Sequence, residues 1–135
     1  MRALVVAIGL ILAGCGGRPA QPVEDVGGGG NVSQMVLRDL RGTRKGELLE
    51  VRATFGDQAQ SLQVQLQFNV TPPARLTTGT WTGLGGQGTV RERAVTFLGG
   101  QNGPPSIGGR FELTGTDGRA LYRVAIPVQP LRSGL

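Results

Sequence analysis

The chain has 135 residues, with fourteen Lys and Arg against nine Asp and Glu, one cysteine and no histidine. The lack of histidine removes the most common general base and the most common transition-metal ligand, and with them the Ser-His and Cys-His nucleophile systems. A lone cysteine cannot form an intramolecular disulfide, so hydrophobic burial has to stabilise the fold. The length suits one domain with one core.

The first fifteen residues have the composition of an export signal. Arg2 supplies a positive charge, and an apolar run from Ala3 to Leu12 follows it. This run is too short for a membrane-spanning helix, which needs roughly 20 apolar residues. The run ends at the sequence Leu-Ala-Gly-Cys, residues 12–15, where the composition changes to Gly and Pro and the only cysteine lies.

This four-residue pattern resembles the lipobox of bacterial lipoproteins. The resemblance implies that the chain is cut before Cys15, that diacylglycerol is attached to the Cys15 thiol, and that the new N-terminus is acylated. It also implies a location in the bacterial cell envelope, on the outer membrane facing the periplasm in a Gram-negative organism, because Gly16 rather than Asp follows the cysteine. An ordinary secretory signal is the alternative interpretation of residues 1–15.

The segment after the signal peptide, residues 15–32, combines the anchor cysteine with Gly, Pro and polar residues and shows no hydrophobic period. Such a composition is typical of flexible linkers. The sequence therefore predicts a signal peptide at 1–14, a lipidated cysteine and flexible tether at 15–32, and one folded domain at 33–135.

Within the domain, apolar and polar residues alternate, which is the pattern of half-buried strands. The clearest runs are Glu47–Phe55 and Ser61–Val70, joined by a hairpin loop at 56–60. Alternation also predicts strands at 110–113 and 120–128, joined by a turn with the hairpin signal Asp-Gly, and weaker runs predict three more at 34–40, 76–82 and 89–98.

Charges and prolines mark two of these strands as irregular. Arg91, Glu92 and Arg93 interrupt the apolar face of the strand at 89–98, which predicts a bulge or an edge strand. Pro127 and Pro130 prevent full pairing of the last strand, which also suits an edge.

The strand pattern predicts an all-β fold, because seven short runs alternate with turn signals and no segment shows a sustained helical period. The expected architecture is an antiparallel two-sheet sandwich of about seven strands, immunoglobulin-like or transthyretin-like in its layout. A small closed β-barrel is the alternative.

Carboxylates are the remaining candidates for catalysis. A pair of them could in principle act as in a glycosidase, yet each lies at a turn or on a polar strand face near Arg, where carboxylates are ordinarily solvated. The carboxylates concerned are Glu47, Glu50, Asp57, Glu92, Glu112 and Asp117. The sequence therefore predicts no catalytic, cofactor-binding or metal-binding residue, with a carboxylate-dependent hydrolase as the rival class.

Two further features have a structural interpretation and a functional one. Residues 83–88 match G-x-G-x-x-G, but a strand-like run follows where a dinucleotide site requires a helix, so a hairpin turn is expected. Trp81 is expected in the core, with stacking on a sugar ring as the alternative.

The densest charge cluster lies around the turn at 42–46. If successive strands alternate in direction, the connections 41–46, 71–75 and 99–106 lie at one end of the domain, away from the tether. The residues expected on this partner surface are Arg41, Arg44, Lys45, Pro72, Pro73, Asn102, Pro104 and Pro105. Such a basic surface suits an acidic protein partner or an acidic envelope polymer, whereas nucleic acid is an unsuitable partner for an exported protein.

Together these features predict an envelope lipoprotein, held to the membrane through its lipid anchor, that acts by binding rather than by catalysis. The expected role is that of an accessory or structural subunit of an envelope complex. A carbohydrate-binding or other ligand-binding module is the alternative, and no cofactor is expected in either case.

Overall fold

The computed structural model describes residues 21–99 and 104–134, which form nine strands. They are β1 (Val23–Asp25), β2 (Val36–Lys45), β3 (Leu48–Gly56), β4 (Ser61–Asn69), β5 (Arg75–Gly83), β6 (Gly86–Leu98), β7 (Ser106–Thr114), β8 (Ala120–Pro130) and β9 (Arg132–Ser133). No helix occurs in these two ranges, and hence none that is long and apolar enough to cross a membrane. The all-β prediction is confirmed.

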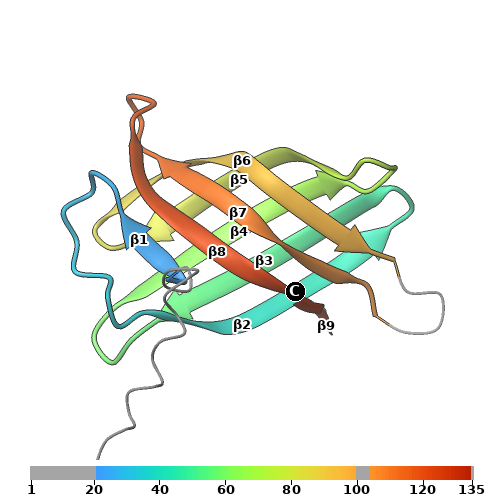
Figure 1. The fold of residues 1–135 in the computed structure, drawn as a ribbon, viewed down its shortest axis with the longest axis horizontal. Coiled ribbons are helices and arrows are strands. Elements are labelled where there is room, and N and C mark those ends of the chain that lie inside the picture. Colours follow the sequence, from blue (N-terminus) through green and yellow to red (C-terminus); the bar gives the residue numbers. More distant parts are fainter. Residues whose placement is uncertain (1–20, 100–103, 135) are drawn as a thin grey trace, which may run out of the picture.

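All nine strands belong to one sheet, in the order β1-β8-β7-β6-β5-β4-β3-β2-β9 (Figure 1). Every neighbouring pair is antiparallel except β2 and β9. The antiparallel prediction thus holds, but a two-sheet sandwich is not confirmed, because the ladder continues from β5 to β6 through the hairpin at 83–86. The alternative of a closed barrel also fails, since β1 and β9 remain as edges.

The sheet curls around a single core. Phe68 of β4 meets Phe111 of β7 edge to face, with 6.0 Å between the ring centroids. Trp81 of β5 meets Tyr122 of β8 in the same way at 5.9 Å. In both pairs the two strands are separated by two other strands in the order of the sheet. The rings therefore meet across the concave side of the curled sheet and not between neighbouring strands.

The sheet would close if the C-terminal half of β8 paired with β2, but neither strand has a regular row of hydrogen-bonding groups there. From Ile126 to Pro130, β8 pairs with β7 alone, and Pro127 and Pro130 carry no N–H to donate to another strand. The facing strand β2 has a bulge between Leu37 and Asp39. Only β9, just after β8, reaches β2, through two residue pairs.

The alternation in the sequence matches the burial in the structure. In β4, Leu62, Val64, Leu66 and Phe68 are buried while the residues between them are exposed or half-buried. The irregularity expected in the strand at 89–98 is a bulge between Glu92 and Ala94 in β6, which is an interior strand and not an edge.

The start of the domain differs from the prediction. Val23 and Val32, both expected in a flexible tether, are buried in the core, and β1 pairs with β8. The folded domain therefore begins before residue 33 and includes residues 22–32. Residues 1–20, with the predicted signal peptide and Cys15, lie outside the described residues.

Candidate functional site

A polar hollow on the described surface spans β3, β4 and β5. Its volume is about 260 Å³, and its lining residues are Glu50, Val51, Arg52, Gln65, Leu66, Gln67, Thr78, Gly79 and Thr80. Successive residues of a strand face opposite sides of the sheet, which explains this composition. Val51, Leu66 and Gly79 face the core, and the polar residues beside them face outward. We call these outward residues, together with Arg41 of β2, the polar face.

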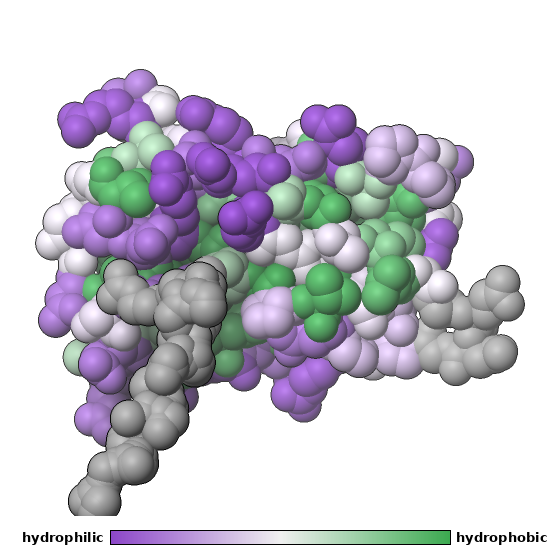
Figure 2. Space-filling view, in the orientation of Figure 1, coloured by the Kyte–Doolittle hydropathy of each residue, from purple (hydrophilic) through white to green (hydrophobic). Residues whose placement is uncertain are grey.

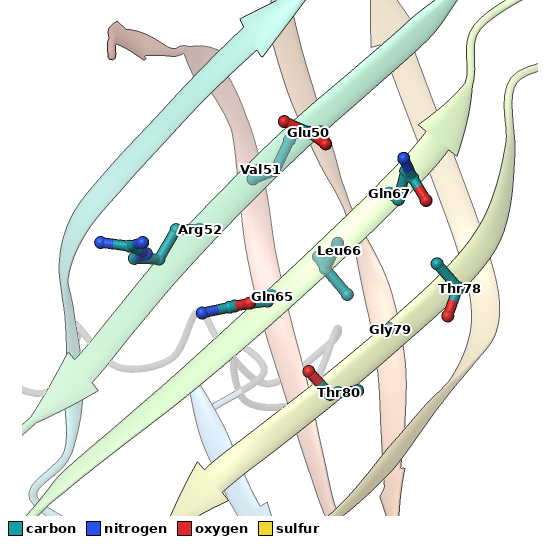
Figure 3. Close-up of a pocket in the computed structure, with 9 residues that line it drawn as sticks. All are labelled: Glu50, Val51, Arg52, Gln65, Leu66, Gln67, Thr78, Gly79 and Thr80. Atoms are coloured by element: carbon teal, nitrogen blue, oxygen red, sulfur yellow. The ribbon is translucent and has the colours of Figure 1, made fainter. Parts of the chain in front are cut away.

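Strand register arranges the polar face in two rows, as Figure 3 shows for β3 to β5. Arg52 lies opposite Gln65, which lies opposite Thr80. The second row joins Glu50, Gln67 and Thr78 in the same way. Amide, hydroxyl, guanidinium and carboxylate groups thus stand side by side on rigid strands.

Arg52 is the unusual member of the polar face. Its Nε atom is buried and has no hydrogen-bond partner among the residues that the structure describes. Arg41 lies directly opposite in the β2–β3 ladder, so two guanidinium groups share one side of the sheet. The carboxylate of Asp39 contacts Arg41, at 2.6 Å from its Nε, and also Arg132 at 3.4 Å. Arg52 forms no ion pair within the described part of the chain, so its charge is available to a partner.

A second charged cluster lies on the outer side of β6, β7 and β8. The carboxylate of Glu112 accepts hydrogen bonds from Arg93 (2.7 Å), Arg123 (3.3 Å) and Arg91 (3.4 Å). Burial acts to raise the pKa of Glu112, but the hydrogen bonds and charges of Arg93 and Arg123 outweigh it, so this pKa lies below its ordinary value. Three cations thus surround one anion.

The predicted partner surface is brought together in part. The β2–β3 turn contacts the β4–β5 connection, because the Val70 N–H donates to the Glu47 carbonyl (2.9 Å). It also contacts the end of β6, where the Arg44 guanidinium lies 5.5 Å from the centre of the Phe97 ring. The β2–β3 turn, the β4–β5 connection and the end of β6 are therefore neighbours.

Individual residues of that surface have different surroundings. Lys45, Pro72, Pro73 and Pro104 are exposed, whereas Pro105 is half-buried. Arg44 uses its Nε to donate to the Gly46 carbonyl (2.9 Å). Arg41 belongs to the polar face on the side of the sheet, and Asn102 lies outside the described residues.

The other sequence features have structural roles. Trp81 is buried, as expected, and its indole N–H donates to the Thr114 carbonyl (2.9 Å). The glycines at 83–86 make the β5–β6 hairpin turn, in which Gly83 and Gly85 have positive φ. Glu92 accepts the Leu76 N–H at 2.7 Å and pairs with Arg75 at 2.9 Å. In the described ranges, no group of three or more potential ligands is placed to hold a metal ion.

Two site features escaped the sequence analysis. The hollow depends on which residues face each other across β3, β4 and β5, and alternation gives the outward side without the register. The missing partner of Arg52 leaves no trace in the sequence, because every Arg on a strand face has the same local pattern. No protein-family model matches the chain, and no curated protein or solved structure matches it.

Proposed function

We propose that this protein is a lipid-anchored, non-catalytic binding protein of the bacterial cell envelope, whose polar face binds acidic groups of a larger partner. The observation that carries the proposal is the charge of Arg52, which is set in a polar hollow beside Arg41 and has neither an ion pair nor a partner for Nε among the described residues. A carboxylate or phosphate group of a partner would form an ion pair with the Arg52 guanidinium and accept a hydrogen bond from its Nε–H.

The size of the hollow favours a macromolecule over a small ligand. Sites that bury a small molecule usually enclose about 300–1,000 Å³, and this one holds about 260 Å³ and is open to solvent. One acidic group that projects from a larger surface fits such a space. This supports the role of an accessory subunit that contacts an acidic protein in an envelope complex.

The rows of amides and hydroxyls favour a second candidate. Gln65, Gln67, Thr78 and Thr80 offer donors and acceptors in the spacing of neighbouring strands. Hydroxyl groups along an acidic polysaccharide could pair with them while its acidic groups meet Arg52. The alternative function is therefore a module that binds an acidic envelope polymer.

Non-catalytic action is supported by the pairing of two of the six candidate carboxylates. Glu112 is engaged by three Arg side chains, and Glu92 by Arg75 and the Leu76 N–H. A glycosidase-type mechanism needs two carboxylates that face one another across a substrate site. Membrane attachment rests on the lipobox-like residues 12–15.

The test uses a photocrosslinking amino acid in place of Gln65, at the centre of the hollow, in intact envelopes. We expect one defined crosslinked product, lost when Arg52→Gln removes the charge and retained in Arg119→Gln, which removes an exposed charge elsewhere. A protein adduct supports the accessory subunit, and a polysaccharide adduct supports the module. The proposal would be contradicted if a crosslinker at exposed Gln58 gave the same product in equal amount, or if Arg52→Gln left the product at position 65 unchanged.

The anchor is tested separately with Cys15→Ser. We expect the wild-type chain to enter the detergent phase on phase partitioning and to carry a labelled fatty acid, because each buried acyl methylene contributes about 0.8 kcal/mol of membrane affinity. The variant should carry no fatty acid. Fatty-acid labelling that survives the substitution would refute lipidation at Cys15.

A further inference from the structure

The chain enters the domain beside the middle of β8. β1 pairs with the first half of that strand, Val23 opposite Val124. One residue earlier, the Pro22 carbonyl accepts the Ala125 N–H (3.0 Å). Strand parity in the sequence predicts this entry at one end of the strands, whereas the structure places it at the edge of the sheet, next to β8.

The position of this entry limits how far the domain can stand from its anchor. Seven residues lead from Cys15 to Pro22. A fully extended chain spans at most about 3.3–3.6 Å per residue, so Pro22 lies within about 25 Å of Cys15 in any conformation. A lipid on Cys15 therefore keeps the β8 edge of the sheet close to the bilayer.

The outer side of β6, β7 and β8 carries excess positive charge. The side chains of Arg91, Arg93 and Arg123 are 60%, 46% and 45% exposed around Glu112, which is only 9% exposed. Arg110 of β7 is exposed as well. Cations on a surface attract anionic lipid headgroups near the membrane.

Apolar residues continue this surface toward the C-terminal half of β8. A groove of about 690 Å³ there includes Pro22, Ala94, Ala125, Pro127 and Val128 in its lining, with Arg110 at its basic side. Val128 is 45% exposed although it is a large hydrophobic residue. Figure 2 shows hydrophilic residues gathered toward the β7–β8 hairpin on this side of the molecule, and hydrophobic residues toward the C-terminal end of β8.

We propose that this outer side of β6–β8, the basic face, rests on a bilayer that contains anionic phospholipid. The inference rests on the proposed lipid anchor, which brings the face to the membrane. The Arg side chains would meet the headgroups, and Pro127 and Val128 would meet the interfacial region. The polar face belongs to β2–β5, in the other half of the curled sheet, and would be turned away from the membrane toward a partner.

The experiment reconstitutes the full lipidated protein in vesicles of phosphatidylcholine, with or without phosphatidylglycerol. A single added cysteine at Val128 or at Gln65 carries a fluorophore, and lipid with a nitroxide in the upper acyl chain quenches it on contact. We expect strong quenching at position 128 that is lost without phosphatidylglycerol or at high salt. Position 65 should stay unquenched throughout.

A pair of charge-matched variants identifies the cause. Arg91→Ser with Arg110→Ser should abolish quenching at position 128, while Arg44→Ser with Lys45→Ser should leave it unchanged. Equal quenching at positions 128 and 65, or quenching at 65 alone, in protein that still floats with the vesicles would overturn the basic face but leave the anchor intact. Failure to float would overturn the anchor, and this inference with it.

Discussion

The ring of Tyr122 fills the space that a side chain at Gly28 would need. The glycine cannot easily withdraw, because its N–H donates to the Leu121 carbonyl (3.0 Å). We expect Gly28→Ala to lower the free energy of unfolding by about 1–3 kcal/mol, the usual cost of overpacking. Urea denaturation at neutral pH measures this loss.

A double-mutant cycle shows whether the ring is the cause. In a Tyr122→Leu background the aromatic ring is absent, so the added cost of Gly28→Ala should shrink to a fraction of its value in the wild type. The same cost in both backgrounds would mean that the backbone at residue 28, and not its contact with Tyr122, is sensitive.

The packing of Gly28 against Tyr122 also explains why composition alone predicts a start of the domain that is too late. Residues 24–30 have the composition of a flexible linker, yet the Asp25 carboxylate accepts the N–H groups of Gly27 (3.0 Å), Gly28 (2.8 Å) and Gly29 (3.1 Å). These hydrogen bonds lower the pKa of Asp25, that from Gly27 most. Glycine serves close packing here, and composition alone does not separate that use from flexibility.

The opposite faces of β4 give a second prediction. Leu66 is 3% exposed, whereas Gln65 points to solvent. Leu66→Ala should cost about 2–5 kcal/mol and Gln65→Ala less than about 0.5 kcal/mol in thermal or urea unfolding. Similar costs at the two positions would contradict the assignment of one face to the core.

Acid should weaken the fold through Glu112. Its folded pKa lies below the ordinary value of 4.5, so its contribution to stability is complete above about pH 4.5 and is lost as the pH falls through the folded pKa. We expect Glu112→Gln to be less stable than the wild type at pH 7 and to approach it at low pH. Urea unfolding across this pH range measures the difference.

The matched control is Glu24→Gln, at an exposed position of β1. Because Glu24 is exposed, the substitution should change the free energy of unfolding at pH 7 by less than about 0.5 kcal/mol. A gap between wild type and Glu112→Gln that stays constant with pH would show that Glu112 acts by packing and not by its charge. The slope that remains in Glu112→Gln should include Asp25 and Asp57, because backbone N–H groups lower the pKa of both carboxylates.

Arg52 should reduce stability in the unbound protein. Its Nε is buried without a partner, and such a group costs about 1–3 kcal/mol. We expect Arg52→Met to raise the free energy of unfolding by about 1 kcal/mol, while Arg38→Met, at an exposed position, stays within about 0.5 kcal/mol. A loss of stability in Arg52→Met would show that Arg52 supports the fold.

The sequence predicts the parts of the fold that depend on neighbouring residues, but not the parts that depend on residues far apart in the chain. Local alternation is enough for the seven predicted strands and for the buried side of β4. The pairing of β1 with β8 and of β9 with β2 joins residues far apart in the chain, such as Arg41 and Arg132, and no local pattern encodes it. The continuity of the sheet itself depends on the pairing of β5 with β6, whose register alternation alone does not give.

The candidate site, like the fold, could be predicted from the sequence only where local patterns determine it. Alternation in the sequence indicates that Gln65 and Gln67 lie on the solvent-exposed side of a strand. The charged residues near Arg41 mark it as a candidate binding residue. The position of Arg41 opposite Arg52 requires the register of β2 and β3, which is constant from Lys45 to Asp39 and shifts only beyond it, at the bulge near Leu37. Side chains that meet across strands are therefore the part of the site that only the structure provides.

The pairing of β1 with β8 has a mechanical consequence. Any tension on the proposed anchor reaches the domain at Pro22 and acts first on the three residue pairs of this ladder. Once these pairs and the hydrogen bonds from Val26 and Gly28 to the Leu121 carbonyl separate, the ten residues from Pro22 to Asn31 can extend as far as the buried Val32, which adds at most about 36 Å of chain at 3.3–3.6 Å per residue. The strands from β2 onward stay hydrogen-bonded to one another, so the protein would respond to load as a short spacer with a reserve of length.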